Sequence, residues 1–124
     1  MVKKVLITDD VHHLLPDGLK RAGFEVDYFP KISLEKVISI IGPYHGLVIN
    51  SKIRVDTSLL NEAPYLQFVA RLGSGMEIID QGETSRRGIA VFNSPDGNCN
   101  AVAEHAMGMI LAWNNHLLRA NDDV

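Results

Sequence analysis

The sequence predicts an α/β fold, in which a doubly wound sheet of five parallel strands carries helices on both faces. The first observation is that short apolar runs alternate along the chain with segments whose apolar residues recur at helical spacing. The second is that the run 46–49 is apolar throughout, as the central strands of a parallel sheet are. The third is length, because 124 residues suffice for one domain with one core. Strands that alternate with helices form a parallel sheet with helices packed on its faces.

The first part of the chain predicts two strands and the helix between them. The apolar run 4–8 predicts a buried strand. Leucines and an alanine at helical spacing predict a helix from about 12 to 22, and Gly23 follows it as a C′ residue. The segment 24–29 alternates apolar and polar residues, which predicts a half-buried strand, and Pro30 ends that strand.

The middle of the chain predicts a helix, a strand and a short helix. Ser33 is a favourable N-cap for a helix that ends at about Ile41, before a Gly-Pro pair. The apolar run 46–49 is the third strand. Either Asp56 or Thr57 caps a short helix that continues through Leu60.

The last part of the chain predicts two further strands and two helices. The segment 66–71 is the fourth strand, and the segment 80–87 is a short helix that ends at Gly88. The run 89–92 is the fifth strand, and a long apolar helix spans roughly 100–118. By analogy with flavodoxin-like sheets we expect the strand order 2-1-3-4-5.

Composition excludes several classes of function. A net charge of −3 without a basic cluster argues against nucleic-acid binding. A single cysteine cannot form an internal disulfide, which fits a reducing cytosol. The apolar run near the N-terminus is too short for a signal peptide, and no run reaches the ~18–20 residues of a membrane span. We therefore expect a cytoplasmic protein with no nucleic-acid or membrane partner.

Polar clusters follow four of the predicted strands, where ligands bind in parallel α/β sheets. They are Asp9-Asp10, Asn50-Ser51-Lys52, Gly73-Ser74-Gly75 and Asn93-Ser94-Pro95. The two aspartates could form a phospho-acceptor site, but no acidic residue follows the third strand, and the favoured interpretation is that one of them caps the next helix.

The glycines at 73 and 75 would let backbone N–H groups approach an anion, although a plain tight turn explains them equally well. They do not form a dinucleotide-binding fingerprint, because its third glycine would fall at Ile78. The Asn50-Ser51-Lys52 cluster suits a small carboxylate, and an ordinary polar loop is the alternative.

The histidines and the cysteine predict no metal or nucleophile site. His105 follows Glu104 directly, and adjacent residues on a helix do not face each other. No His-Glu-x-x-His motif is present. Cys99 lies before a helix without an evident histidine partner, so we interpret it as an unreactive loop residue.

The last helix carries apolar residues around most of its circumference. Such a helix is expected to be buried on most faces, whereas a five-stranded domain covers only one of them. We therefore predict that residues 101–118 contact either a second domain or a second copy of the chain, and that the protein self-associates there.

Three segments together carry a family resemblance: Gly73-Ser74-Gly75, then Asn93-Ser94-Pro95, then Ala101-Val102-Ala103-Glu104. With this spacing the chain resembles the N-terminal part of the D-isomer-specific 2-hydroxyacid dehydrogenases, and phosphoglycerate dehydrogenases most of all. The resemblance covers essentially the whole chain. It implies a substrate-binding domain over 1–99 and an interdomain helix over 100–124 that leads to an NAD-binding domain outside this sequence.

The resemblance also implies roles for individual residues. Asn50, Ser51, Ser74, Gly75 and Met76 match positions that bind the substrate, and Ser74 also matches one that approaches the nicotinamide end of NAD. The family's catalytic Arg, Glu and His match no residue here. Phosphoglycerate dehydrogenases typically have Arg in place of Asn50, which weakens the case for phosphoglycerate as the substrate. The family's usual Asp and Asn are Glu77 and Ile78 here, so we expect a polar contact to be lost.

The sequence thus predicts the substrate-binding part of an NAD-dependent D-2-hydroxyacid dehydrogenase, inactive by itself and without tight NAD binding. The partner would be a small 2-hydroxy or 2-keto acid. The alternative is a stand-alone carboxylate-binding or regulatory module that dimerises through its last helix.

Overall fold

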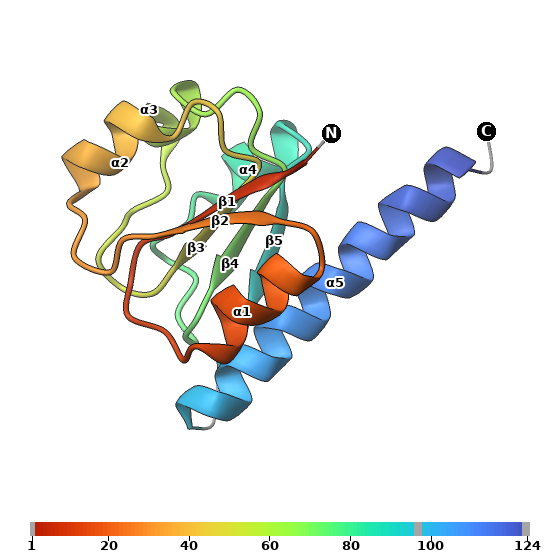
Figure 1. The fold of residues 1–124 in the computed structure, drawn as a ribbon. Coiled ribbons are helices and arrows are strands. Elements are labelled where there is room, and N and C mark those ends of the chain that lie inside the picture. The colour runs from red at the N-terminus through yellow and green to blue at the C-terminus, as the bar shows by residue number, and fades with distance from the viewer. Residues whose placement is uncertain (1, 96–97, 123–124) are drawn as a thin grey trace.

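A computed structural model describes residues 2–95 and 98–122, with the side chains of Cys99 and of residues 117–122 outside the description. Strands and helices alternate along the whole chain (Figure 1). They are β1 Lys4–Ile7, α1 Leu14–Arg21, β2 Glu25–Tyr28, α2 Leu34–Ile40, β3 Gly46–Ile49, α3 Thr57–Asn61, β4 Phe68–Arg71, α4 Gln81–Arg86, β5 Ala90–Asn93 and α5 Cys99–Asp122.

The five strands form a single parallel sheet in the order β2-β1-β3-β4-β5, which confirms the predicted fold and strand order. The inner strands β3 and β4 are buried at every position, whereas the edge strands β2 and β5 are only partly covered. This difference is expected, because an inner strand of a doubly wound sheet is covered on both faces and paired along both edges.

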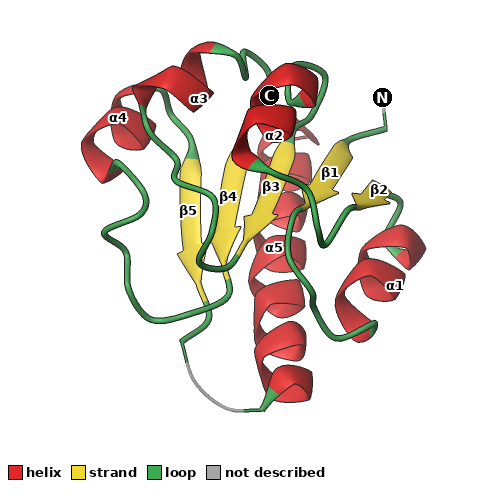
Figure 2. Cartoon of the chain, turned by 90° about the vertical axis from the view of Figure 1, so that its left-hand side faces the viewer, coloured by secondary structure: helices red, strands yellow, loops and turns green. Residues whose placement is uncertain are grey.

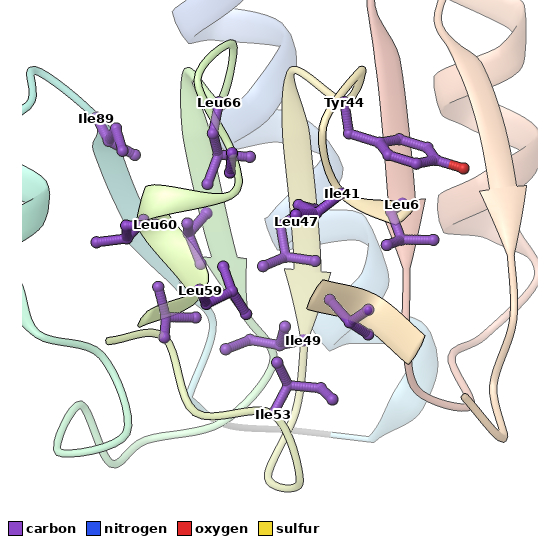
Figure 3. Close-up of a cluster of buried hydrophobic side chains, with 14 of the residues drawn as sticks. Leu6, Ile41, Tyr44, Leu47, Ile49, Ile53, Leu59, Leu60, Leu66 and Ile89 are labelled. Carbon is purple, nitrogen blue, oxygen red and sulfur yellow. The ribbon is translucent and has the colours of Figure 1, made fainter. Parts of the chain in front are cut away.

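Helices cover the two faces of the sheet in two separate layers. Helices α2, α3 and α4 lie on one face, and α1 and α5 lie on the other, as Figure 2 shows with α5 behind the strands. The core on the first face is drawn in Figure 3 and consists mainly of leucine and isoleucine side chains from the strands, α3 and the connecting segments. The core on the second face gathers side chains of α1 and α5 around Phe68.

Local sequence explains most of the helix ends. The side chains of Ser33, Asp56 and Asp80 each accept a backbone N–H three residues later, and so cap α2, α3 and α4. Helix α1 is followed by Gly23 at φ +102°, the left-handed conformation expected of a C′ glycine.

Helix α1 begins differently from the prediction. Its N-cap is His13, whose side chain makes no capping hydrogen bond, and the N–H of Leu14 donates to Nδ1 of His12 at 3.2 Å. The prediction that Asp9 or Asp10 caps this helix is wrong. The helix starts later than expected, and both carboxylates are engaged in contacts with distant parts of the chain, described below.

Helix α5 buries a narrower stripe than its composition predicts. Ala103, Ala106 and Ile110 are buried, and Met107 and Trp113 are partly buried against the same core. In contrast, Ala101 and Ala112 are exposed. Leu117 and Leu118, which the prediction of a broad apolar surface also included, lie outside the described side chains. Among the described helices none combines the length and apolarity required to cross a membrane.

Candidate functional site

The carboxyl ends of the parallel strands meet at one edge of the sheet, and the loops after β1, β3, β4 and β5 lie along it. All four polar clusters that the sequence places there lie in residues that the structure describes. This edge is the candidate functional site.

The most informative side chain at this edge is Arg71, the last residue of β4. It is only 8 % exposed, yet among the described residues its guanidinium has no carboxylate partner, since both ion pairs found there use Glu83. Its Nη1 donates to Oδ1 of Asn50 at 3.4 Å, and its buried Nε has no hydrogen-bond partner in the described structure. A cation removed from water is costly unless an anion compensates it, so this arrangement favours binding of an anion.

The backbone of Gly73 passes directly over this guanidinium. A Cβ atom at position 73 would lie 2.1 Å from Nη1 of Arg71 and 3.3 Å from Oδ1 of Asn50. Only glycine therefore allows the loop to pack so closely on the cation. Within the described residues, the N–H groups of Gly73, Ser74 and Gly75 donate to no protein acceptor, which leaves them available to an anion.

The loop that follows β4 is held at both ends. At its start the N–H of Leu72 donates to the carbonyl of Ile49 at 2.9 Å, which continues the pairing with β3. At its far end Ile79 forms a parallel bridge with Val55, and the side chain of Met76 packs on the core beneath α2 and α3. The loop is thus a fixed platform, as a preorganised binding site requires.

The carboxylate of Asp9 positions the opposite side of the site. Its Oδ2 accepts the backbone N–H of Asn50 at 2.9 Å and the hydroxyl of Thr8 at 3.0 Å. Asp9 therefore ties the end of β1 to the end of β3 and fixes the backbone from which Asn50 reaches Arg71. This is the contact that replaces the helix cap expected from the sequence.

A small cavity of about 130 Å³ opens beside Asn50, between the loop after β1 and α5. Its volume corresponds to about four water molecules. It is lined by Asp10, Val11, His12, Asn50, Leu72, Val102 and Ala103. Helix α5 thus forms one wall at the edge of the sheet.

Ser94 and His105 form a contact that the sequence did not indicate. The hydroxyl of Ser94 donates to the carbonyl of Val102 at 3.2 Å, and Nδ1 of His105 lies 3.0 Å from the same hydroxyl oxygen. Ser94 is buried, and its N–H donates to the carbonyl of Arg71 at 2.9 Å. The pair therefore fastens the start of α5 to the end of β4.

The sequence-predicted site residues are only partly brought together. Asn50 contacts Arg71 beneath Gly73, whereas the side chains of Ser51 and Ser74 are exposed and form no hydrogen bond among the described residues. At Gly75 a Cβ would lie 2.6 Å from Oε1 of Glu77, so a carboxylate sits against that part of the loop. An anion is therefore favoured at the Gly73 end of the loop, next to Arg71.

Sequence reasoning missed Arg71, although a signal was present. A charged residue closes an otherwise apolar strand and stands directly before a Gly-x-Gly turn. Asp9 and Ser94 belong to the polar clusters that the sequence places at this edge, but no motif indicates their contacts with Asn50 and His105. Among the described residues no group of three or more His, Cys, Asp or Glu side chains is placed to share a metal ion.

Comparison with known proteins gives a consistent result. Residues 5–119 match the family model of the D-isomer specific 2-hydroxyacid dehydrogenase catalytic domain. The chain is similar to D-3-phosphoglycerate dehydrogenases of Synechocystis (34 % identity, 98 % of this chain and 22 % of the relative) and Archaeoglobus fulgidus (33 %, 88 % and 21 %). It thus spans about a fifth of the length of these curated relatives.

A solved structure shows the same fold. NAD+-bound 3-phosphoglycerate dehydrogenase of Entamoeba histolytica aligns with 77 % of this chain and 33 % of its own, at a TM-score of 0.66 and 22 % identity. A likeness at 22 % sequence identity shows a shared fold alone.

Proposed function

The chain belongs to the D-isomer specific 2-hydroxyacid dehydrogenases, and from this premise we propose that it forms the substrate-binding side of such an enzyme. In the complete enzyme the reaction is hydride transfer between C2 of a 2-hydroxy acid and NAD. This chain would hold the substrate carboxylate and orient C2 toward the cofactor. Its interdomain helix would be α5, which leads away from the sheet (Figure 1).

The buried, uncompensated guanidinium of Arg71 under Gly73 supports this proposal best. A substrate carboxylate placed above Gly73 would accept hydrogen bonds from the free loop N–H groups and would compensate the charge of Arg71. Asn50 and Ser51 would flank the substrate from the end of β3, and Met76 would close the apolar side of the loop. Asn50 orients the guanidinium through its Oδ1.

NAD would contact this chain at one point. The exposed hydroxyl of Ser74 is free to approach the nicotinamide end. The remaining residues do not fit the whole dinucleotide, because Ile78 stands where its phosphate-binding turn needs glycine and the carboxylate of Glu77 lies against Gly75. We therefore expect no tight NAD binding by these 124 residues.

The proposal is tested by comparing ligand binding with turnover. We expect the chain to bind pyruvate in an NMR titration and to ignore acetone, which lacks the carboxylate. Arg71→Gln should weaken pyruvate binding at least about tenfold, since a hydrogen bond to a charged group contributes roughly 1.5–3 kcal/mol. The matched control is Arg21→Gln, because Arg21 ends α1 at the opposite edge of the sheet.

Two outcomes would contradict the proposal. Equal pyruvate affinity for Arg71→Gln and the parent chain would show that Arg71 does not bind the substrate carboxylate. NADH-linked reduction of 2-keto acids by the chain alone would contradict the expected inactivity, which rests on the lack of matches to the family's catalytic Arg, Glu and His.

A second candidate function is a stand-alone carboxylate-binding or regulatory module. It is favoured by one observation, namely that α5 buries only a narrow stripe of its apolar residues. Such a module would dimerise through residues 101–118, where Ala101 and Ala112 remain exposed. The coding sequence distinguishes the two functions. A continuation into a Gly-x-Gly-x-x-Gly segment favours the dehydrogenase, and a stop codon favours the module.

A further inference from the structure

A larger cavity lies where β2 leads into α2. Its volume is about 630 Å³, within the roughly 300–1,000 Å³ of small-molecule sites. It is lined by Tyr28, Phe29, Pro30, Lys31, Ile32, Lys36, Ile40 and Tyr44. None of these residues lines the cavity beside Asn50, and the function proposed above gives this larger cavity no role.

The aromatic walls of this cavity are fixed by contacts outside it. The hydroxyl of Tyr28 donates to Oδ1 of Asp10 at 2.8 Å, and the hydroxyl of Tyr44 donates to Oδ2 of Asp27. In Figure 3 the Tyr44 hydroxyl points away from the buried leucine cluster. Burial and the neighbouring carboxylates raise the pKa of both tyrosines, so both hydroxyls stay protonated as donors. The rings therefore line a preformed space and need no rearrangement to receive a ligand.

The segment between β2 and α2 is held as well. Nζ of Lys52 donates to the carbonyl of Pro30 at 2.8 Å, and the N–H of Ile32 donates to the carbonyl of Phe29 at 3.1 Å. Even so, 45 % of Phe29 and 38 % of Tyr28 remain exposed, although both are large apolar side chains. Exposed aromatic surface gathered around a cavity is typical of a binding site, whereas isolated exposed side chains are not.

The charge of the cavity indicates what it would bind. Lys31 and Lys36 are its only charged lining residues, and neither forms an ion pair among the described residues. Both are exposed, so their ammonium groups can reach a ligand at the rim. We propose that this cavity binds an aromatic carboxylate, with the ring system among Tyr28, Phe29 and Tyr44 and the carboxylate on the two lysines.

The probe for this proposal is 2-naphthoate, and its uncharged analogue 2-naphthamide is the matched ligand control. Titration of the isotopically labelled chain should give saturable NMR shifts at residues 28–32, Lys36 and Ile40. The double variant Lys31→Gln/Lys36→Gln should weaken naphthoate binding about tenfold and leave naphthamide binding unchanged. Lys20→Gln, on the exposed side of α1, should change neither.

A second variant tests the aromatic wall independently of charge. Phe29→Ala removes a side chain that is nearly half exposed, so the fold should persist, and both ligands should bind more weakly. The proposal is overturned if the naphthoate shifts do not saturate or map elsewhere. Equal effects of the lysine variants on both ligands would also overturn it.

Two further measurements distinguish ligand binding in this cavity from self-association and from binding at Arg71. Concentration-dependent shifts of the same resonances without ligand would assign the cavity to a second copy of the chain and overturn the proposal. Arg71→Gln should leave naphthoate binding unchanged, so failure of the pyruvate site and failure of this one remain distinguishable. Loss of naphthoate binding in Arg71→Gln would show that naphthoate binds beside Arg71 at the edge of the sheet. That result would overturn the proposal for the larger cavity.

Discussion

The two faces of the sheet are closed in different ways. The first face is covered by α2, α3 and α4, which are five to seven residues long. Each of these helices is capped by the side chain of its N-cap residue. The opposite face is covered by α1, which has no side-chain cap, and by the 24-residue α5. The first face therefore depends on many local contacts, and the second depends on packing between elements distant in sequence.

Aromatic side chains concentrate on the second face. The ring of Trp113 lies 4.9 Å from that of Phe68 and 6.2 Å from that of Phe92, both in edge-to-face geometry. Nζ of Lys3 lies 4.9 Å from the centroid of the Trp113 ring. These contacts fix α5 on the sheet, and the same helix forms one wall of the cavity beside Asn50. Packing on this face thus positions part of the candidate site.

The largest expected effect comes from Phe68→Ala, which removes the centre of the second face. We expect it to lower the free energy of unfolding by about 3–5 kcal/mol, because a fully buried aromatic is lost and a cavity is left. Urea denaturation measures the loss. Trp113 is the only tryptophan, so its emission should shift to longer wavelength as α5 loosens.

Leu60→Ala is the matched change on the first face. It should cost about 2–5 kcal/mol without moving the Trp113 emission of the folded state. Equal emission shifts for both variants would show that the two faces do not respond separately.

An intermediate effect is expected where α1 meets α5. A Cβ at Gly18 would lie 1.9 Å from Sδ of Met107, so Gly18→Val should push the helices apart and cost roughly 1–3 kcal/mol. Gly108→Ala in α5 is the control, since no atom lies within 4 Å of its Cβ position. It should stabilise the chain by about 0.5–1 kcal/mol. Thermal unfolding of both variants checks the opposite signs.

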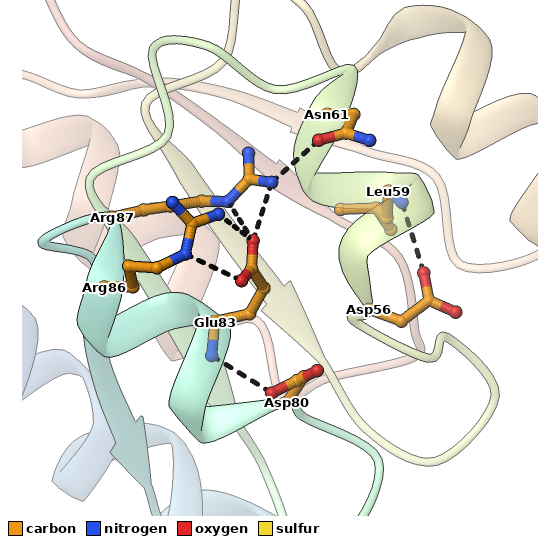
Figure 4. Close-up of polar contacts among 7 residues, drawn as sticks. All are labelled: Asp56, Leu59, Asn61, Asp80, Glu83, Arg86 and Arg87. Carbon is orange, nitrogen blue, oxygen red and sulfur yellow. Dashed lines mark hydrogen bonds and ion pairs between the residues drawn. The ribbon is translucent and has the colours of Figure 1, made fainter.

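The smallest expected effect belongs to the first face, where Arg87 connects Glu83 of α4 to Asn61 of α3. Glu83 accepts from Arg86 and Arg87, and Arg87 also donates to Oδ1 of Asn61 at 2.7 Å (Figure 4). These hydrogen bonds lower the pKa of Glu83 from 4.5 to about 2. The resulting stability is present above about pH 4.5 and is lost as the pH falls toward 2.

Urea midpoints measured from pH 5 to pH 2 test this prediction. In Glu83→Gln the urea midpoint should fall less steeply as the pH is lowered. The difference should shrink in 1 M NaCl, because Arg86 is exposed and salt screens surface charges. A urea midpoint that falls with pH as steeply in Glu83→Gln as in the parent chain would contradict the prediction.

The candidate site was predictable only where its signals are local. Two glycines around one serine after a strand predicted a loop that can receive an anion, and parallel strands predicted its position at the carboxyl edge. The contact of Arg71 with Asn50 spans 21 residues of sequence, and that of Asp9 with Asn50 spans 41. Neither contact has a periodicity or a motif, so the sequence predicts a helix cap at Asp9 or Asp10 that the structure does not contain.

Local sequence is sufficient for the alternation of strands and helices, the cap of α2 at Ser33 and the turn at Gly23. Each of these depends on residues within a few positions of one another, whose backbone preferences act before any tertiary contact forms. Tertiary structure alone decided which charges are buried and which cavities open. Three features arise only when distant segments pack together: the burial of Arg71, the hydrogen bond from Asn50 to Asp9, and the aromatic cavity beside α2. The free-energy cost of burying a charge such as that of Arg71 depends on all the groups that surround it.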